Sequence, residues 1–143
     1  MPQFSPKKVQ RYLEFAKSAS YNSDFPRHKL GACFVFRGAV LANGWNQQKT
    51  SPLQKKYNEE RDYDTEACYT HTNCLHAEVS CLNKIKDLDI QFDKGVLYIY
   101  REHRNNHKAL AKPCLACEAM IRDLGIKDVV YTTENGYAIE HFD

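Results

Sequence analysis

The sequence lacks several features that would place the protein in a membrane or on nucleic acid. No hydrophobic run approaches the roughly 20 residues that a membrane-spanning helix needs. The net charge is only +2, which is too small to indicate a polyanionic partner by itself. The first residues, Met-Pro-Gln-Phe-Ser-Pro-Lys-Lys, lack the apolar core of a secretory signal peptide. Internal repeats and low-complexity tracts are also absent. We therefore expect no membrane association and a cytoplasmic protein.

The composition is that of a globular protein. With 143 residues, 43% hydrophobic and 27% charged, the chain is long enough for one compact domain, which we expect to span residues 1–143. The chain has six cysteines. Without a secretory signal, metal binding or burial explains them better than disulfides do. Cys33 lies in an apolar run and is expected in the core.

Local patterns predict alternating helices and strands. Ser5 and Pro6 begin a helix that should end before residue 21, because apolar side chains recur at helical spacing up to residue 19. Strands are predicted at 30–36, 40–45, 95–100 and 128–132, helices at 76–85 and 114–124, and a short strand or helix after Gly136. Gly125 should cap the second of these helices. This order implies parallel strand pairing in the second half, with helices on both faces of the sheet.

Two polar segments interrupt the pattern. Residues 47–73 form a long connection for a compact domain, and such segments are often functional or partly helical. Residues 101–112 form a second polar loop.

The strongest chemical signal is His76-Ala77-Glu78 followed by residues 113–117, which read Pro-Cys-Leu-Ala-Cys. Cys114 and Cys117 are three residues apart at a helix start, so both thiols lie on one face, where the positive helix end favours thiolates. One imidazole and two thiolates can hold a zinc ion and leave its fourth position open for water, as in catalytic sites. The carboxylate of Glu78 could then move protons to and from the reacting atoms.

Simpler interpretations of these residues exist. Cys114 and Cys117 could be a redox C-x-x-C pair, although this leaves the His76 and Glu78 pair unexplained. Glu78 could be a carboxylate that only stabilises a helix N-terminus.

The pattern H-x-E…P-C-x-x-C is the signature of zinc nucleobase deaminases, and over residues 30–132 the chain resembles the cytidine and deoxycytidylate deaminase superfamily. The helix at 114–124 and the strand after it resemble the deoxycytidylate and tRNA-adenosine deaminase branch. Tetrameric deaminases of free cytidine usually have a third cysteine where this chain has His76. The resemblance implies an α/β protein with a three-layer α/β/α cytidine-deaminase-like fold, a five-stranded mixed sheet whose strands 4 and 5 are parallel, and one catalytic Zn²⁺.

The resemblance also implies substrate contacts. Gly44-Trp45-Asn46 resembles a segment whose asparagine hydrogen-bonds the substrate sugar, so that role is carried to Asn46; an asparagine in a turn is the alternative. The backbone N–H of Ala77 is expected to bind the pyrimidine carbonyl.

Basic residues in the two polar segments are further candidates for substrate contacts. Lys49, Arg101 and Arg104 could bind a 5′-phosphate or a strand backbone, or could form a solvated basic surface.

Other features of the polar segments depart from the family pattern or leave alternatives open. The loop before Pro113 is longer and more basic than usual, and the segment after Asn46 differs from that of typical deoxycytidylate deaminases, which affects the expected phosphate contacts. A second, structural zinc could involve Cys68, His71 and Cys74, or the cysteines could be reduced and buried. Tyrosines that could stack bases, or serve as core or rim aromatics, are Tyr57, Tyr63 and Tyr69.

The sequence therefore predicts a zinc-dependent enzyme that removes the exocyclic amino group from a cytosine in a free nucleotide such as deoxycytidylate, releasing ammonia. One alternative is a deaminase acting on cytosine or adenine in single-stranded DNA or RNA. Another is a non-catalytic, zinc-stabilised binding module. The resemblance also makes a homo-oligomer plausible, because members of the superfamily often complete their pockets across subunits.

Overall fold

The architecture is a five-stranded sheet covered by helices on both faces. The computed structural model describes residues 4–25, 28–49, 51–58, 74–102 and 108–143. The sheet consists of β1 (Lys29–Phe36), β2 (Ala39–Trp45), β3 (Gly95–Glu102), β4 (Asp128–Thr133) and β5 (Gly136–His141). Their order across the sheet is β2-β1-β3-β4-β5. The predicted strands are therefore all present, and a strand follows Gly136.

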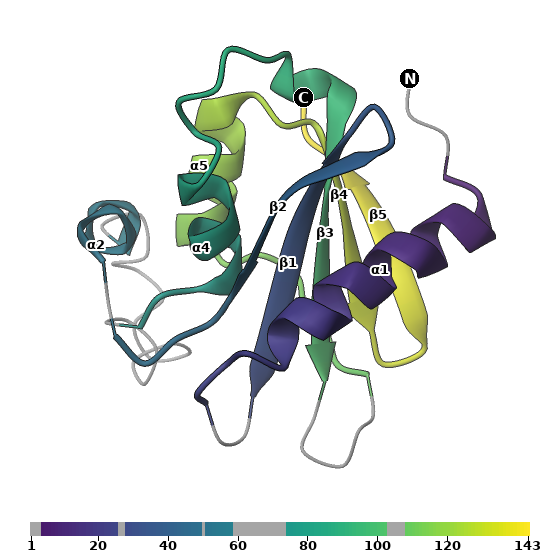
Figure 1. Cartoon of the computed structure of the whole chain (residues 1–143), viewed down its shortest axis with the longest axis horizontal. Coiled ribbons are helices and arrows are strands. Elements are labelled where there is room, and N and C mark those ends of the chain that lie inside the picture. The colour runs from purple at the N-terminus through teal and green to yellow at the C-terminus, as the bar shows by residue number, and fades with distance from the viewer. Residues whose placement is uncertain (1–3, 26–27, 50, 59–73, 103–107) are drawn as a thin grey trace.

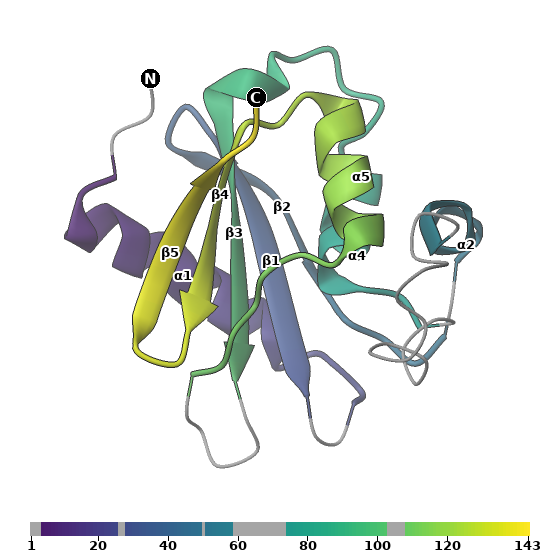
Figure 2. The same cartoon turned by 180° about the vertical axis from the view of Figure 1, so that it is seen from behind.

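Alternate side chains of the strands pack against different helices. Helix α1 (Pro6–Ser20) covers one face through Val9, Leu13 and Ala16, which pack with Cys33 and other strand residues. The opposite face packs against α4 (Ala77–Asn83) and α5 (Leu115–Leu124). Figure 1 shows α1 in front of the strands, and Figure 2, from the other side, shows it behind them. The predicted three-layer α/β/α arrangement is confirmed.

One pair of neighbouring strands runs in the predicted relative direction, and another pair does not. Strands β3 and β4 are parallel, as the intervening helix α5 requires. Strands β4 and β5 are antiparallel, so the expectation that strands 4 and 5 run parallel is wrong. The reason is the connection: Thr133 pairs with Gly136, which leaves a two-residue turn. Such a turn closes a hairpin, whereas a parallel pair needs a crossover of about a dozen residues or more.

The helix boundaries follow local capping chemistry. The Ser5 hydroxyl accepts a hydrogen bond from the backbone N–H of Lys8 (3.2 Å) and so caps α1. Gly125 ends α5 in the left-handed conformation (φ 86°), which glycine adopts at low cost. Cys33 is fully buried, as predicted. In the described part of the chain, none of the helices is both long and apolar enough to cross a bilayer.

The first long polar segment is partly helical. It contains α2 (Pro52–Asn58), which packs beside α4 and α5. Just before α2, Gln47 exchanges backbone hydrogen bonds with Leu75 (2.9 and 3.0 Å). These bonds fix the chain directly before His76. Residues 59–73 and 103–107, which include several residues considered above, lie outside the described residues.

Gly44 in β2 lets helix α4 approach the sheet closely. A Cβ atom at this position would overlap backbone atoms of Ala77 and Cys81. Backbone atoms of a helix cannot yield as a flexible side chain can. The contact therefore sets how closely α4, and with it the adjacent His76, lies on the sheet.

We predict that Gly44→Ala destabilises the protein, because α4 must move away from β2. The expected loss is about 1–3 kcal/mol or more in the free energy of unfolding, measured by denaturant titration. Asn43→Ala is the matched control, since Asn43 is exposed on the same strand and its loss should change stability by less than about 0.5 kcal/mol. An unchanged unfolding midpoint for Gly44→Ala would contradict the close contact.

Candidate active site

Two helix N-termini bring the predicted metal ligands together. His76 is the N-cap residue of α4 and Cys114 is the N-cap residue of α5, both with extended backbone dihedrals. Neither side chain caps its own helix. Cys117 follows in the first turn of α5 and is buried. The C-x-x-C spacing thus places both sulfurs on the face of α5 that meets the start of α4.

The distances among these side chains suit a tetrahedral ion. Ligand atoms of His76, Cys114 and Cys117 all lie within 4.8 Å of one another. The His76 Nδ1 atom is 3.6 Å from the sulfur of Cys114 and 3.3 Å from that of Cys117. Typical zinc–sulfur and zinc–nitrogen bonds at a tetrahedral angle put the two donors about 3.6 Å apart. The residues therefore fit a zinc ion bound through Nδ1 and two sulfurs.

The two thiols shift each other's pKa in opposite directions. A hydrogen bond from Cys117 lowers the pKa of Cys114 to about 3, and nearby His76 also favours the thiolate. The same hydrogen bond, together with burial, raises the pKa of Cys117 well above its usual value. Binding of a cation to both sulfurs would release the Cys117 proton, because the thiolate is the metal ligand.

Glu78 lies buried beside these ligands, with a side chain that interacts with Cys117. The residue is 4% exposed, and its Oε1 atom has no hydrogen-bond partner among the residues that the structure describes. Burial raises the pKa of the carboxyl, while the charge of His76 opposes this shift. A buried acceptor without a donor is costly. The orphaned oxygen is therefore well suited to accept a proton or hydrogen bond from a bound reactant.

Among the described residues, no other group of three histidine, cysteine or acidic side chains lies close enough to hold a metal ion. Of the suggested second zinc site, Cys74 is half-buried, whereas Cys68 and His71 lie outside the described residues. The second zinc site thus stays a hypothesis.

Asn46 lies at the end of β2 and holds the start of β1. Its Oδ1 accepts a hydrogen bond from the backbone N–H of Leu30 (2.9 Å), and its Nδ2 donates to the carbonyl of His28 (2.7 Å). An amide oxygen has a second lone pair and an amide nitrogen a second N–H. The anchoring contacts therefore leave the chemical capacity for a sugar contact, which stays a prediction.

The remaining substrate-contact candidates have different environments. Ala77 is buried in the first turn of α4, where backbone N–H groups have no partner within the helix. Lys49 is exposed, and its carbonyl accepts a hydrogen bond from Leu75 N, next to His76. Arg101 donates to the carbonyl of Leu110 (3.2 Å) and lies 3.2 Å from the His28 ring. Arg104 is not among the described residues.

Arg101 is more buried than a surface cation. Burial lowers the pKa of its guanidinium, and the Nε atom has no hydrogen-bond partner among the described residues. The contacts with Leu110 and His28 connect β3 to the loop before Pro113 and to the start of β1. The side chain therefore shapes this edge of the sheet, whether or not it also binds phosphate.

Of the three tyrosines considered for base stacking, Tyr57 is buried and donates a hydrogen bond to Asp123 (2.8 Å). It thus belongs to the packed interior between α2 and α5, whereas Tyr63 and Tyr69 are outside the described residues. No sequence pattern singles out Gln54, although its side-chain oxygen accepts a hydrogen bond from the backbone N–H of His76 (2.9 Å). A glutamine in a polar segment carries no local signal for a tertiary contact.

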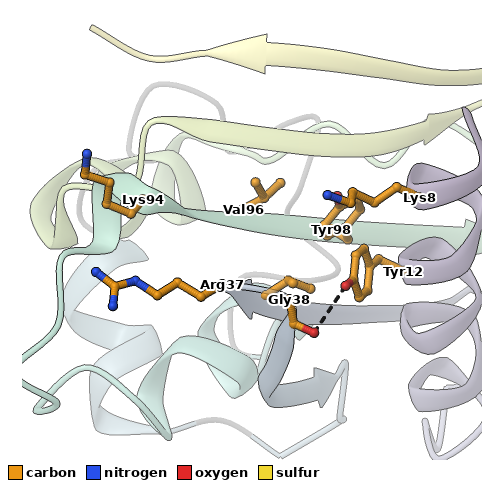
Figure 3. A pocket seen from close by; sticks show the side chains of 8 residues that line it. Lys8, Tyr12, Arg37, Gly38, Lys94, Val96 and Tyr98 are labelled. Carbon is orange, nitrogen blue, oxygen red and sulfur yellow. Dashed lines mark hydrogen bonds between the residues drawn. The ribbon is translucent and has the colours of Figure 1, made fainter. Parts of the chain in front are cut away.

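A separate pocket lies at the opposite end of the sheet, beside the β1–β2 turn. Figure 3 shows basic side chains around it and the hydrogen bond from the Tyr12 hydroxyl to the carbonyl of Gly38 (3.3 Å). The pocket contains no histidine or cysteine, so it lacks the donors of the site between α4 and α5. Its lining residues are Lys8, Tyr12, Val35, Arg37, Gly38, Lys94, Val96 and Tyr98.

Comparison with known families agrees with this geometry. Residues 6–133 match the model of the cytidine and deoxycytidylate deaminase zinc-binding region. The chain belongs to this deaminase family. The matched region includes both ligand-bearing helix starts and Glu78.

Individual members of the deaminase family resemble the chain over most of its length. A deoxycytidylate deaminase of Schizosaccharomyces pombe is 29% identical over 139 residues, covering 91% of this chain and 38% of that protein. The chain thus spans less than two fifths of that relative's length.

Solved structures show the same fold. The dCMP deaminase of cyanophage S-TIM5, in apo form, is 29% identical with a TM-score of 0.61, covering 91% of this chain and 86% of that one. The same enzyme in complex with dCMP and dUMP is 28% identical with a TM-score of 0.62, covering 92% and 85%. A cytidine deaminase from Burkholderia pseudomallei, 19% identical with a TM-score of 0.63 over 92% and 91% of the chains, shares the fold.

We predict that the metal-free protein binds one Co²⁺ per chain and develops thiolate-to-metal charge-transfer absorption. His76→Ala and Cys117→Ser should each lose this absorption or bind Co²⁺ far more weakly, because each removes one of three donors. Cys33→Ala is the control: its thiol is equally buried but lies on the α1 face of the sheet. Equal Co²⁺ spectra for Cys117→Ser and the unmodified protein would show that the metal binds elsewhere.

Proposed function

We propose that this protein catalyses the hydrolytic deamination of a cytosine in a free nucleotide, of the deoxycytidylate type, with release of ammonia. The observation that carries the proposal is the buried Glu78 carboxyl beside three side chains that fit a zinc ion. The family match and the relatives named deoxycytidylate deaminases support the same reaction.

His76, Cys114 and Cys117 are the residues that would hold zinc. When bound there, zinc makes a hydroxide nucleophile available at neutral pH. Three protein ligands suit this role, because a structural site would have a fourth. A non-catalytic zinc module would also have no use for a buried Glu78 carboxyl whose Oε1 lacks a partner among the described residues, which costs stability in the folded protein.

Glu78 is assigned the proton transfers of the reaction. Its carboxylate takes a proton from the attacking water and delivers it to N3 of the cytosine ring as the new C4–O bond forms. A second proton then passes from the new C4–OH group through Glu78 to the exocyclic nitrogen, the C4–N bond breaks as C4=O forms, and ammonia leaves. The products are the uracil nucleotide and ammonia, so one water molecule is consumed. A carboxyl whose pKa is raised by burial suits a group that must both accept and donate.

The other candidates are assigned to substrate binding. The Ala77 N–H would donate to the pyrimidine carbonyl and Asn46 to the sugar, while Lys49 and Arg101 would contact the phosphate. A small nucleotide is favoured over single-stranded nucleic acid for two reasons. The net charge is only +2, and the S-TIM5 enzyme was solved in complex with dCMP and dUMP.

The substrate class is tested by measuring ammonia release from cytidine, deoxycytidine, their 5′-monophosphates and short single-stranded oligonucleotides. We expect dCMP to be turned over with the highest kcat/KM. Preference for an oligonucleotide, with binding that weakens steeply as salt rises, would instead support the nucleic-acid alternative.

We predict that Glu78→Gln lowers kcat by a factor of about 10² to 10⁴, since the amide cannot carry the proton. Zinc content measured by elemental analysis should stay at one per chain, because Glu78 is not a ligand. Glu118→Gln is the control, as this carboxylate lies in the first turn of α5 but is partly exposed and paired with Arg122 (3.7 Å). Full activity of Glu78→Gln would refute the proton-transfer role.

A further inference from the structure

Helix α2 contacts both helices that carry the metal ligands. The Gln54 side-chain oxygen accepts a hydrogen bond from the backbone N–H of His76 (2.9 Å). One turn further on, the Tyr57 hydroxyl donates to Asp123 in α5 (2.8 Å). Residues three apart lie on the same face of a helix. The same face of α2 therefore binds the beginning of α4 and the last turn of α5.

Gln54 is fully buried, with 0% of its surface exposed. Burying a primary amide is unfavourable unless its polar atoms are hydrogen-bonded, and an aliphatic residue would fill the same volume at lower cost. The backbone of Gln54 is itself held, because its N–H donates to the Ser51 hydroxyl (3.1 Å) at the start of α2. A rigidly held, buried amide thus has its oxygen directed at the backbone of a metal ligand.

The backbone of His76 is a sensitive place for such a contact. As the N-cap residue, His76 has an extended conformation, and its N–H lies outside the hydrogen-bond ladder of α4. The ring atom that faces the two sulfurs is Nδ1, the ring nitrogen nearer to the main chain. A shift of the His76 backbone would therefore move the donor nitrogen by a similar amount relative to the thiols.

The second contact joins α2 to the far end of α5, the helix whose N-terminal end carries the cysteine pair. Tyr57 is buried, and its hydrogen bond to Asp123 joins α2 to the helix that carries Cys114 and Cys117. Because Gln54 contacts α4 and Tyr57 contacts α5, α2 limits the relative movement of the two ligand-bearing helices. Outer-shell contacts of this kind typically change metal affinity by about 10- to 100-fold when removed.

We propose that Gln54 is a positioning residue for the metal site, and that α2 fixes the spacing between His76 and the cysteine pair through Gln54 and Tyr57. This inference rests on the proposed function only in that the site must hold zinc.

The test measures zinc affinity, by competition with a chromophoric chelator, in folded variants well below their unfolding temperatures. Gln54→Met keeps the volume but removes the acceptor, and should weaken zinc binding about 10-fold or more. Gln54→Glu retains an oxygen acceptor and should recover part of the loss. Leu53→Met is the matched control, because it introduces the same side chain one position earlier in α2 and should leave zinc affinity unchanged.

Tyr57→Phe provides a second variant that removes only a hydroxyl and so keeps the packing. It should weaken zinc binding measurably, though less than Gln54→Met does. The proposal is overturned if Gln54→Met, or Tyr57→Phe should Gln54→Met not fold, binds zinc within twofold of the unmodified protein. It is also overturned if Leu53→Met loses as much affinity as Gln54→Met.

Zinc affinity and turnover separate this inference from the proposed function. If Gln54→Met weakens zinc binding but the unmodified protein releases no ammonia from any substrate, only the proposed function fails. If the unmodified protein releases ammonia and Gln54→Met binds zinc normally, only the positioning role fails.

Discussion

The meeting of two helix N-termini on one buried spot is the constraint on which the rest of the structure depends. Helices α4 and α5 both direct their positive ends toward His76, Cys114 and Cys117. Such an arrangement favours negative groups, in the same direction as the hydrogen bond from Cys117 and the nearby His76, which lower the pKa of Cys114 to about 3. It also requires that both helices be held at fixed distances from the sheet. Gly44 sets the distance of α4 from the sheet, and the parallel β3–α5–β4 unit sets that of α5.

Much of this architecture could be predicted because its signals are local. The Ser5–Pro6 start of α1, the Gly125 end of α5 and the strand patterns act within a few residues, and the structure has them within one or two positions. The direction of β5 was predicted wrongly because it was taken from the family resemblance. The local sequence was the better guide here, since Glu134 and Asn135 form too short a connection for anything but a hairpin.

Contacts between residues far apart in the sequence could be predicted only where the residues carry distinctive chemistry. The three predicted ligands do so, and the structure brings them together although His76 and Cys117 are 41 residues apart. Gln54 carries no such signature: its contact with His76 spans 22 residues and depends on where α2 packs. Asn46 shows a related difficulty. The sequence indicated a ligand contact, whereas the structure adds a role in anchoring β1 that no local pattern expresses.

The burial that suits the site to the proposed reaction also costs stability in the metal-free fold. Glu78 has a buried oxygen without a partner among the described residues, and the two sulfurs lie 3.3 and 3.6 Å from the imidazole Nδ1 of His76. A bound cation would satisfy these three donors, so part of its binding free energy would appear as folding free energy. Supports outside the ligand set, such as Gln54 and the Gly44 contact, then have a clear physical purpose. They keep the ligands in place before the cation arrives, so that less binding energy is spent on ordering the site.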